Sequence, residues 1–365
     1  MFGKKDTKPD LDALVARLES VTDPVLEEPV GALGWLGTPA IEKKRVKVPV
    51  TLPTLAWRGR GELQKRLESA AGDLEGKTLE LDWKAEVERS RGTSANDLLP
   101  EVKNVVLLAS GKGGVGKSTV ASNVAAALAA RGAAVGLLDA DIYGPSVPTM
   151  FGTDQRPEVN GQSLMPVQRH GLALMSIGFI VRPEDAMVWR GPMLNGAITQ
   201  FMRDVQWGAL DYLIIDMPPG TGDVQLTIAQ HLKVSGAVLV STPQDVALAD
   251  VIRGKAMFDK TDIPALGVIE NMAYFVCGDC GARHEIFSSG GAGQLAGKMG
   301  LPLLGEVPLD IEARKAADAG RPVVLEHPEA ASAKAFFDIA DTVATELAKA
   351  AKKFTAKPSG LKIIQ

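Results

Sequence analysis

A glycine-rich segment at residues 111–119 combines the residue types that bind a polyphosphate. It matches the pattern G-x-x-x-x-G-K-[ST] and reads Gly111, Lys112, Gly113, Gly114, Val115, Gly116, Lys117, Ser118 and Thr119. Glycines let successive backbone N–H groups turn toward phosphate oxygens, Lys117 can reach the outer phosphates, and the Ser118 hydroxyl can bind Mg²⁺. An apolar run at residues 105–108 precedes the loop and an alanine-rich run at 122–131 follows it. The sequence therefore predicts a nucleotide and Mg²⁺ site between a strand and a helix.

Acidic residues follow two further apolar runs. Asp216 ends the run at residues 213–216, and a loop rich in proline and glycine follows it, a composition suited to changing shape with the state of a γ-phosphate. Asp139 and Asp141 end another run, so in a doubly wound sheet these acids would lie at the edge where ligands bind. One of them could orient an attacking water. The alternatives are a helix-capping or strand-end acid at Asp216 and a turn cap at Asp141.

The chain contains two cysteines, Cys277 and Cys280, and their Cys-x-x-Cys spacing lets two thiolates point at one metal. A [4Fe-4S] cluster usually takes four cysteines, so two copies of the chain would complete the ligand set. This count predicts a homodimer.

Three other interpretations of the cysteine pair remain open. Zinc could bind Cys277, Cys280 and His284 or four thiolates from two chains, although one chain offers no obvious fourth ligand. A thioredoxin-like pair would normally begin a helix, whereas the residues after Cys280 indicate a loop. Two incidental buried thiols are the last alternative, and His284 itself is most simply a solvated loop residue.

The elements that must position these residues follow from hydrophobic patterning. From residue 104 onward, short apolar strands alternate with helices, which predicts a parallel sheet covered on both faces. The expected strands are 104–110, 134–139, 172–177, 212–216, 236–241, 266–271 and 301–307, and the expected helices include 118–131, 192–205, 246–260 and about 329–352.

A small separate unit is expected at residues 9–85, where helical spacing and strict alternation indicate an α+β domain. Residues 86–103 are polar and turn-rich and are expected to be a linker. The predicted nucleotide-binding domain spans 104–352, and a flexible basic tail spans 353–365.

Composition limits the function classes. Among 365 residues, 40 basic and 44 acidic side chains give a net charge of −4, so no global positive field favours nucleic acid or anionic lipid as a partner. The first residues lack the apolar stretch of a secretion signal, and no apolar run approaches the ~18 residues that span a bilayer. We expect a cytoplasmic protein with no membrane partner, where reduced thiols favour metal or redox chemistry.

These motifs together resemble the MinD/ParA-like branch of P-loop ATPases, in which a signature lysine follows the first glycine of the loop, as Lys112 does here. More narrowly, the sequence resembles the Mrp/ApbC iron-sulfur cluster carriers over roughly residues 100–350. Residues 9–85 resemble, more loosely, the MIP18-type domain that often precedes this ATPase. The segments that carry the carrier resemblance are 111–119, 139–146, 189–193, 216–223 and 277–280.

The resemblance implies an α/β P-loop NTPase fold, a mostly parallel doubly wound sheet preceded by a small α+β domain. It implies that Lys112 crosses a homodimer interface to the partner's nucleotide and that Asp141 positions the hydrolytic water. It further implies that Asp216 holds the Mg²⁺ shell and that Asn271 contacts adenine. The implied activity is slow hydrolysis of ATP, coupled to transfer of a bridging [4Fe-4S] cluster from a donor to apo-proteins.

A rival function is a ParA/MinD-like positioning switch whose ATP-bound dimer binds DNA or membrane. The tail at residues 352–360 is broken by turn formers and the charge balance is acidic, so neither partner is favoured. A zinc-bridged ATPase dimer is a second alternative. A nitrogenase-reductase-like electron donor is a third, but those relatives place their cluster cysteines far apart in sequence.

Overall fold

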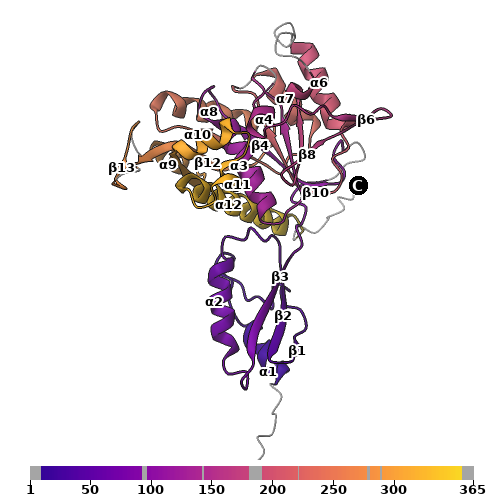
Figure 1. Cartoon of the computed structure of the whole chain (residues 1–365), viewed down its shortest axis with the longest axis vertical. Coiled ribbons are helices and arrows are strands. Elements are labelled where there is room, and N and C mark those ends of the chain that lie inside the picture. Colours follow the sequence, from indigo (N-terminus) through magenta and orange to yellow (C-terminus); the bar gives the residue numbers. More distant parts are fainter. Residues whose placement is uncertain are drawn as a thin grey trace, which may run out of the picture. The chain divides into compact units, whose positions relative to one another are not determined.

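The computed structural model describes residues 10–92, 97–141, 144–180, 191–220, 222–277, 280–287 and 290–355 (Figure 1). The chain divides into two units, Met1–Val87 and Glu88–Gln365. Each unit has its own sheet, so each is described separately below.

The first unit is a small α+β domain, as the sequence predicts. Its sheet has the order β1-β2-β3, with β1 antiparallel and β3 parallel to β2. Alternate residues of β2 are buried, which places one face of the sheet in the core beside helix residues such as Leu14 and Leu63. The elements are α1 (Leu11–Glu19), β1 (Ala40–Glu42), β2 (Arg45–Leu52), α2 (Arg60–Ala71) and β3 (Thr78–Ala85).

The second unit is built on a mostly parallel sheet with the strand order β13-β12-β11-β4-β10-β5-β9-β8, and β14 also pairs with β12. The strands are β4 (Val102–Ala109), β5 (Val135–Asp139), β8 (Val167–Arg169), β9 (Leu172–Ser176), β10 (Leu210–Asp216), β11 (Gly236–Ser241), β12 (Ala265–Val276), β13 (Arg283–His284) and β14 (Leu303–Leu309). Only β8 and β13 run antiparallel to their neighbours among the described strands of this sheet. A separate hairpin joins β6 (Glu158–Asn160) and β7 (Ser163–Met165).

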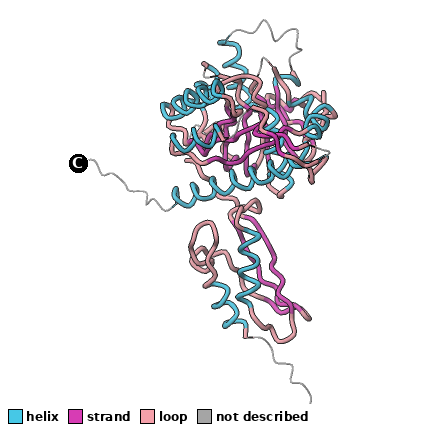
Figure 2. Tube along the Cα trace, turned by 90° about the vertical axis from the view of Figure 1, so that its left-hand side faces the viewer, coloured by secondary structure: helices cyan, strands magenta, loops and turns pink. Residues whose placement is uncertain are grey.

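Helices cover both faces of the large sheet, and Figure 2 shows its strands lying between helical layers. Val105 and Leu107 of β4 belong to the core that contains buried residues of α6, α7, α8 and α9, whereas α3 packs against α11 and α12. Because both faces of the sheet are buried, its central strands are apolar throughout, and apolar and polar residues do not alternate along them. The helices are α3 (Lys117–Ala130), α4 (Val147–Met150), α6 (Gly191–Asp204), α7 (Asp223–His231), α8 (Asp245–Lys260), α9 (Gly291–Lys298), α10 (Ile311–Asp318), α11 (Val323–Glu326) and α12 (Ala331–Thr355), with a short 3-10 turn at Ile177–Phe179.

The predicted parallel sheet is confirmed, but strand β12 is longer than expected. The sequence predicts its end near residue 271, whereas β12 continues to Val276 through an irregularity at Met272, whose φ is +56°. Pairing with β14 and then with β13 supplies the hydrogen bonds that extend it. One strand therefore runs from the nucleotide loop to the cysteines.

From Glu88 onward, the described residues of the segment expected as a linker belong to the second unit. Arg91 is 3% exposed, and its guanidinium donates to Asp97 and to the carbonyls of Leu99 and Val102. At the other end, α12 extends to Thr355, so the first residues of the expected tail are helical; residues 356–365 lie outside the described residues.

Candidate functional site

The predicted phosphate loop lies between β4 and α3, at the carboxyl edge of the sheet. Gly114 and Gly116 have φ values of +83° and +76°, which glycine adopts without strain. A Cβ on Gly116 would meet Asn271 Nδ2 at 2.2 Å, and one on Gly111 would meet Asp250 Cβ of α8 at 2.1 Å. Backbone conformation therefore favours glycine at 114, close packing requires it at 111, and both apply at Gly116.

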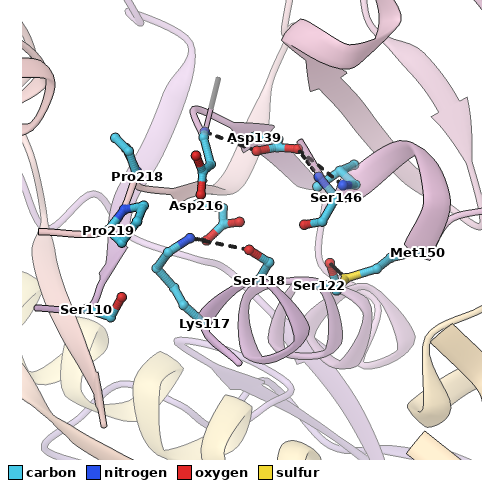
Figure 3. A network of polar contacts seen from close by, with 12 residues as sticks. Ser110, Lys117, Ser118, Ser122, Asp139, Ser146, Met150, Asp216, Pro218 and Pro219 are labelled. Carbon is cyan, nitrogen blue, oxygen red and sulfur yellow. Dashed lines mark hydrogen bonds and ion pairs between the residues drawn. The ribbon is translucent and has the colours of Figure 1, made fainter. Parts of the chain in front are cut away.

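Lys117 and Ser118 begin helix α3 and point toward Asp216 at the end of β10 (Figure 3). Lys117 Nζ forms an ion pair with Asp216 Oδ1 and lies 3.3 Å from Ser118 Oγ. Asp216 is fully buried, and burial raises the pKa of its carboxyl while the Lys117 ammonium opposes the rise. Among the described residues, Asp216 Oδ2 has no hydrogen-bond partner.

The donor set fits a hydrated Mg²⁺ ion. Mg²⁺ prefers oxygen ligands and keeps several waters in its shell. Ser118 supplies a hydroxyl, and Asp216 Oδ2 supplies a buried carboxylate oxygen that otherwise lacks a partner among the described residues. The residues present therefore suit the ion that the phosphate loop implies.

Asp139 organises the loop after β5 instead of facing the ligand. Its carboxylate accepts hydrogen bonds from the backbone N–H groups of Asp141, Ser146 and Val147, at 3.1, 3.0 and 3.2 Å, and from the Ser176 hydroxyl at 3.0 Å. Burial and the neighbouring Asp216 raise the pKa of Asp139 to about 7, while the backbone donors oppose the rise. Of the two acids that the sequence offered for water activation, only Asp141 lines the ligand cavity described next.

A cavity of about 250 Å³ opens over the phosphate loop. It brings Lys112, Lys117 and Asp141 together, and Lys112 is exposed to solvent. A larger cavity, of about 550 Å³, is lined by Val102 and Trp207 at the opposite edge of the sheet and is separate from these residues. The smaller cavity is lined by Ser110, Lys112, Gly113, Gly114, Val115, Gly116, Lys117, Ser118, Thr119, Asp141, Ser146, Met150 and Pro219.

Residue types and spacing in the sequence point to no role for Ser146 and Met150 of this lining. Ser146 and Met150 reach the cavity because Asp139 holds the start of α4. The Asp139 carboxylate accepts hydrogen bonds from the backbone N–H groups of Ser146 and Val147. No local sequence pattern marks such a contact.

Asn271 lies within β12 and is 6% exposed. Its side-chain amide donates a hydrogen bond of 2.9 Å to the carbonyl of Val115 in the phosphate loop. The structure thus brings Asn271 to the nucleotide site, and its adenine contact stays a prediction.

The two cysteines lie in a tight turn between β12 and β13. The Cys277 N–H donates to the Ala282 carbonyl at 2.9 Å, and the Gly281 N–H donates to the Cys277 carbonyl at 2.9 Å. Gly281 has a φ of +69°, the left-handed conformation that closes such turns. Cys277 is half-buried, Cys280 is exposed, and both are thiols. The described residues after Cys280 lead into strand β13 and form no helix, unlike those of a thioredoxin-like pair.

The described residues of one chain assemble no zinc site. In the described part of the chain, no group of three or more His, Cys, Asp or Glu side chains could hold a metal ion. His284 is exposed on β13, where its ring lies 6.5 Å from that of Phe275. The described part of one chain thus presents two thiols, and their role as cluster ligands stays a prediction.

A family model described as ParA, NUBPL iron-transfer P-loop NTPase, matches residues 101–344. The chain belongs to this family. A Deinococcus radiodurans relative of this iron-transfer P-loop NTPase, described as an iron-sulfur cluster carrier protein, is 46% identical over 339 residues, covering 92% of this chain and 95% of that protein. An Escherichia coli K12 relative with the same description is 52% identical over 248 residues, covering 67% of each.

Solved structures of similar proteins agree with the iron-transfer P-loop NTPase fold. A nucleotide-binding protein from Archaeoglobus fulgidus in complex with ADP has a TM-score of 0.58 and 40% identity, covering 67% of this chain and 98% of that chain. The cell-division ATPase MinD of Pyrococcus furiosus has a TM-score of 0.52 and 24% identity, covering 66% of this chain and 98% of that chain, and shares the fold.

Parts of the sequence segments on which the family prediction rests lie outside the described residues of this P-loop NTPase. They are residues 142–143, 189–190, 221 and 278–279. No helix in the described ranges has the length and apolar character needed to cross a membrane.

Proposed function

We propose that this iron-transfer P-loop NTPase is a homodimeric ATPase that carries a [4Fe-4S] cluster on Cys277 and Cys280 of two copies and delivers it to apo-proteins. The observation that carries the proposal is the cysteine turn directly after β12, the strand that also contacts the phosphate loop through Asn271. Relatives described as iron-sulfur cluster carriers support the cargo. Because cluster ligation needs reduced thiols, we place the protein in the cytoplasm.

The homodimer is supported by the ligand count and by the surface around the turn. Two thiols are half of the usual set of four for a [4Fe-4S] cluster. Val276, Ile286 and Phe287 flank the turn in sequence and are 36%, 55% and 38% exposed, which gives apolar area that a second copy would cover. A twofold axis through this surface would bring four thiolates together.

Each residue of the nucleotide site has a distinct part in hydrolysis. The loop N–H groups and Lys117 bind the β- and γ-phosphates, and Asp141 orients the attacking water. Lys112, exposed at the cavity, reaches the nucleotide of the partner copy and stabilises the charge that develops on the transferred phosphoryl group. Ser118 and Asp216 would hold Mg²⁺, which would supply electrostatic stabilisation of the phosphates.

Cluster delivery is a ligand exchange. Each iron–sulfur bond to a carrier cysteine is replaced by one bond to a recipient thiolate, with no change in oxidation state. Because Cys280 is exposed and Cys277 half-buried, a recipient can reach the ligands from the turn side. ATP binding changes the phosphate loop and, through β12, the placement of the turn.

Anaerobic reconstitution with iron and sulfide tests the proposal. The wild-type chain should gain absorbance near ~400 nm, bind about four irons and four sulfides per dimer, and transfer them to an apo-protein with four cysteines. C277S and C280S should lose the cluster, whereas Lys117→Ala should keep the cluster and lose ATP hydrolysis. A colourless protein with stoichiometric zinc, or a monomer that holds and transfers a cluster, would overturn the proposal.

The cysteine turn also separates this function from a positioning switch. Such a switch requires ATP-dependent binding to DNA or vesicles and has no use for two thiols in one turn. Co-sedimentation with either surface, together with absent cluster transfer, would favour the switch.

A further inference from the structure

The hydroxyl of Ser146 is an unexplained polar group of the nucleotide cavity. Ser146 precedes α4 and lines the cavity with the phosphate loop. Its Oγ is buried and has no hydrogen-bond partner among the described residues. Buried hydroxyls are nearly always hydrogen-bonded in native proteins, so an unpaired one at a ligand cavity indicates a contact made when the ligand binds.

Asp139 fixes the position of Ser146 within the cavity. The Ser146 N–H donates to Asp139 Oδ2 at 3.0 Å, and Asp139 lies opposite Asp216 in the register of β5 and β10. Ser146 is thereby held on the side of the cavity where Lys117, Ser118 and Asp216 meet (Figure 3). These are the residues for the outer phosphates and Mg²⁺.

A neighbouring serine shows that this hydroxyl is not needed to hold the loop. Ser176 Oγ donates to Asp139 Oδ2 at 3.0 Å, so that hydroxyl already has a structural partner. Ser146 donates a hydrogen bond to the same carboxylate through its backbone N–H, which remains in any non-proline variant. The Ser146 side chain is thus left available for a ligand.

We propose that Ser146 Oγ contacts the Mg²⁺-bound terminal phosphate of ATP and so distinguishes ATP from ADP. The inference rests on the proposed function as an ATPase. Because the contact exists only with a γ-phosphate, it ties the position of α4 to the nucleotide state. Ser146 acts as a specificity-determining residue of the nucleotide site.

Calorimetric titration with Mg²⁺ and either ADP or a non-hydrolysable ATP analogue tests this contact. Ser146→Ala should weaken binding of the analogue by about tenfold and change ADP binding by less than about twofold. Ser146→Thr keeps the hydroxyl and should restore the analogue affinity. Asn160→Ala, at an exposed position in β6 outside the cavity lining, is the control and should leave the affinity for both nucleotides unchanged.

The outcomes separate this inference from the proposed function. If the wild-type chain binds both nucleotides and Ser146→Ala binds both as tightly, or loses both equally, the Ser146 contact is wrong while the ATPase proposal stands. If the wild-type chain binds neither nucleotide, both are wrong. Thermal unfolding of each variant shows whether an affinity loss reflects loss of folding.

Discussion

The side-chain amide of Asn271 donates a hydrogen bond of 2.9 Å to the carbonyl oxygen of Val115, so β12 holds the phosphate loop directly. The same strand ends at Val276, and Cys277 follows it. β12 pairs with β11 as far as Glu270 and with β14 at residues 268–271 and again at Phe275. Near the cysteines, β13 pairs with Phe275 and Val276, so backbone hydrogen bonds hold the strand at both ends of this stretch. The nucleotide site and the thiol turn are therefore linked through one continuous element.

Replacing Asn271 by alanine should weaken binding of all nucleotides by about tenfold. The reason is that the buried Val115 carbonyl would lose its hydrogen-bond donor, and the phosphate loop would lose its contact with β12. Calorimetry with ATP and GTP analogues measures the change. Asn160→Ala, at an exposed position in β6, is the control. A loss confined to adenine nucleotides would instead support the predicted contact between Asn271 and adenine, and unchanged affinity would refute both roles.

Removing Lys117 should destabilise the nucleotide-free protein as well as abolish nucleotide binding. Lys117→Ala leaves Asp216 buried without its cation, at a cost of about 3–5 kcal/mol in the free energy of unfolding. Adding Asp216→Asn removes the buried charge and should restore most of the stability without restoring binding. Urea unfolding of the single and double variants measures this, and equal stabilities of the two would contradict the ion-pair argument.

The action of Lys112 across the dimer can be tested by mixing two inactive variants. Lys112→Ala retains a nucleotide site, and Lys117→Ala retains Lys112. In a mixed dimer, the first subunit binds ATP and the second supplies the lysine, so ATPase activity should return to about a quarter of wild type with random pairing. Neither variant alone should be active. If mixing restores nothing while mixed dimers form, Lys112 acts within its own subunit.

Glu270 should make stability depend on pH. Its side chain is 1% exposed, Oε2 accepts a hydrogen bond of 2.6 Å from the Ala292 N–H, and Oε1 has no partner among the described residues. Burial raises the pKa of Glu270, as does Glu306, while the N–H groups of Ala292 and Gly290 and the charge of Arg283 lower it. A raised pKa in the folded state means that this group stabilises the fold at low pH, and that the contribution is lost as pH rises through that pKa.

Glu270→Gln keeps an acceptor for Ala292 and removes the titration. Between pH 5 and pH 8, the melting temperature of wild type relative to this variant should fall, by on the order of 2–4 °C. Glu329→Gln, whose side chain is 89% exposed, is the control and should leave the pH profile unchanged. If the melting temperature of wild type instead rose with pH relative to that of Glu270→Gln, Glu270 would be ionised in the folded state and would stabilise it.

Local sequence patterns were sufficient to predict the chemistry of this protein. The loop at Gly111–Thr119 lies within one strand-to-helix connection, and the two cysteines lie within one turn, so residue spacing alone predicted a nucleotide at the loop and a cluster or metal at the cysteine pair. The parallel sheet followed from apolar strands alternating with helices, because burial on both faces leaves that signature in composition. Predicting these features requires no information on contacts between residues that are far apart in the chain.

The tertiary structure decided how those parts are connected. Asp139 and Asp141 look alike in sequence, but strand register places Asp139 under three backbone N–H groups and leaves Asp141 at the cavity. The contact of Asn271 with Val115, the extension of β12 to the cysteines and the approach of Ser146 also join residues distant in the chain. Such contacts depend on strand order and packing, which hydrophobic period and residue spacing do not specify.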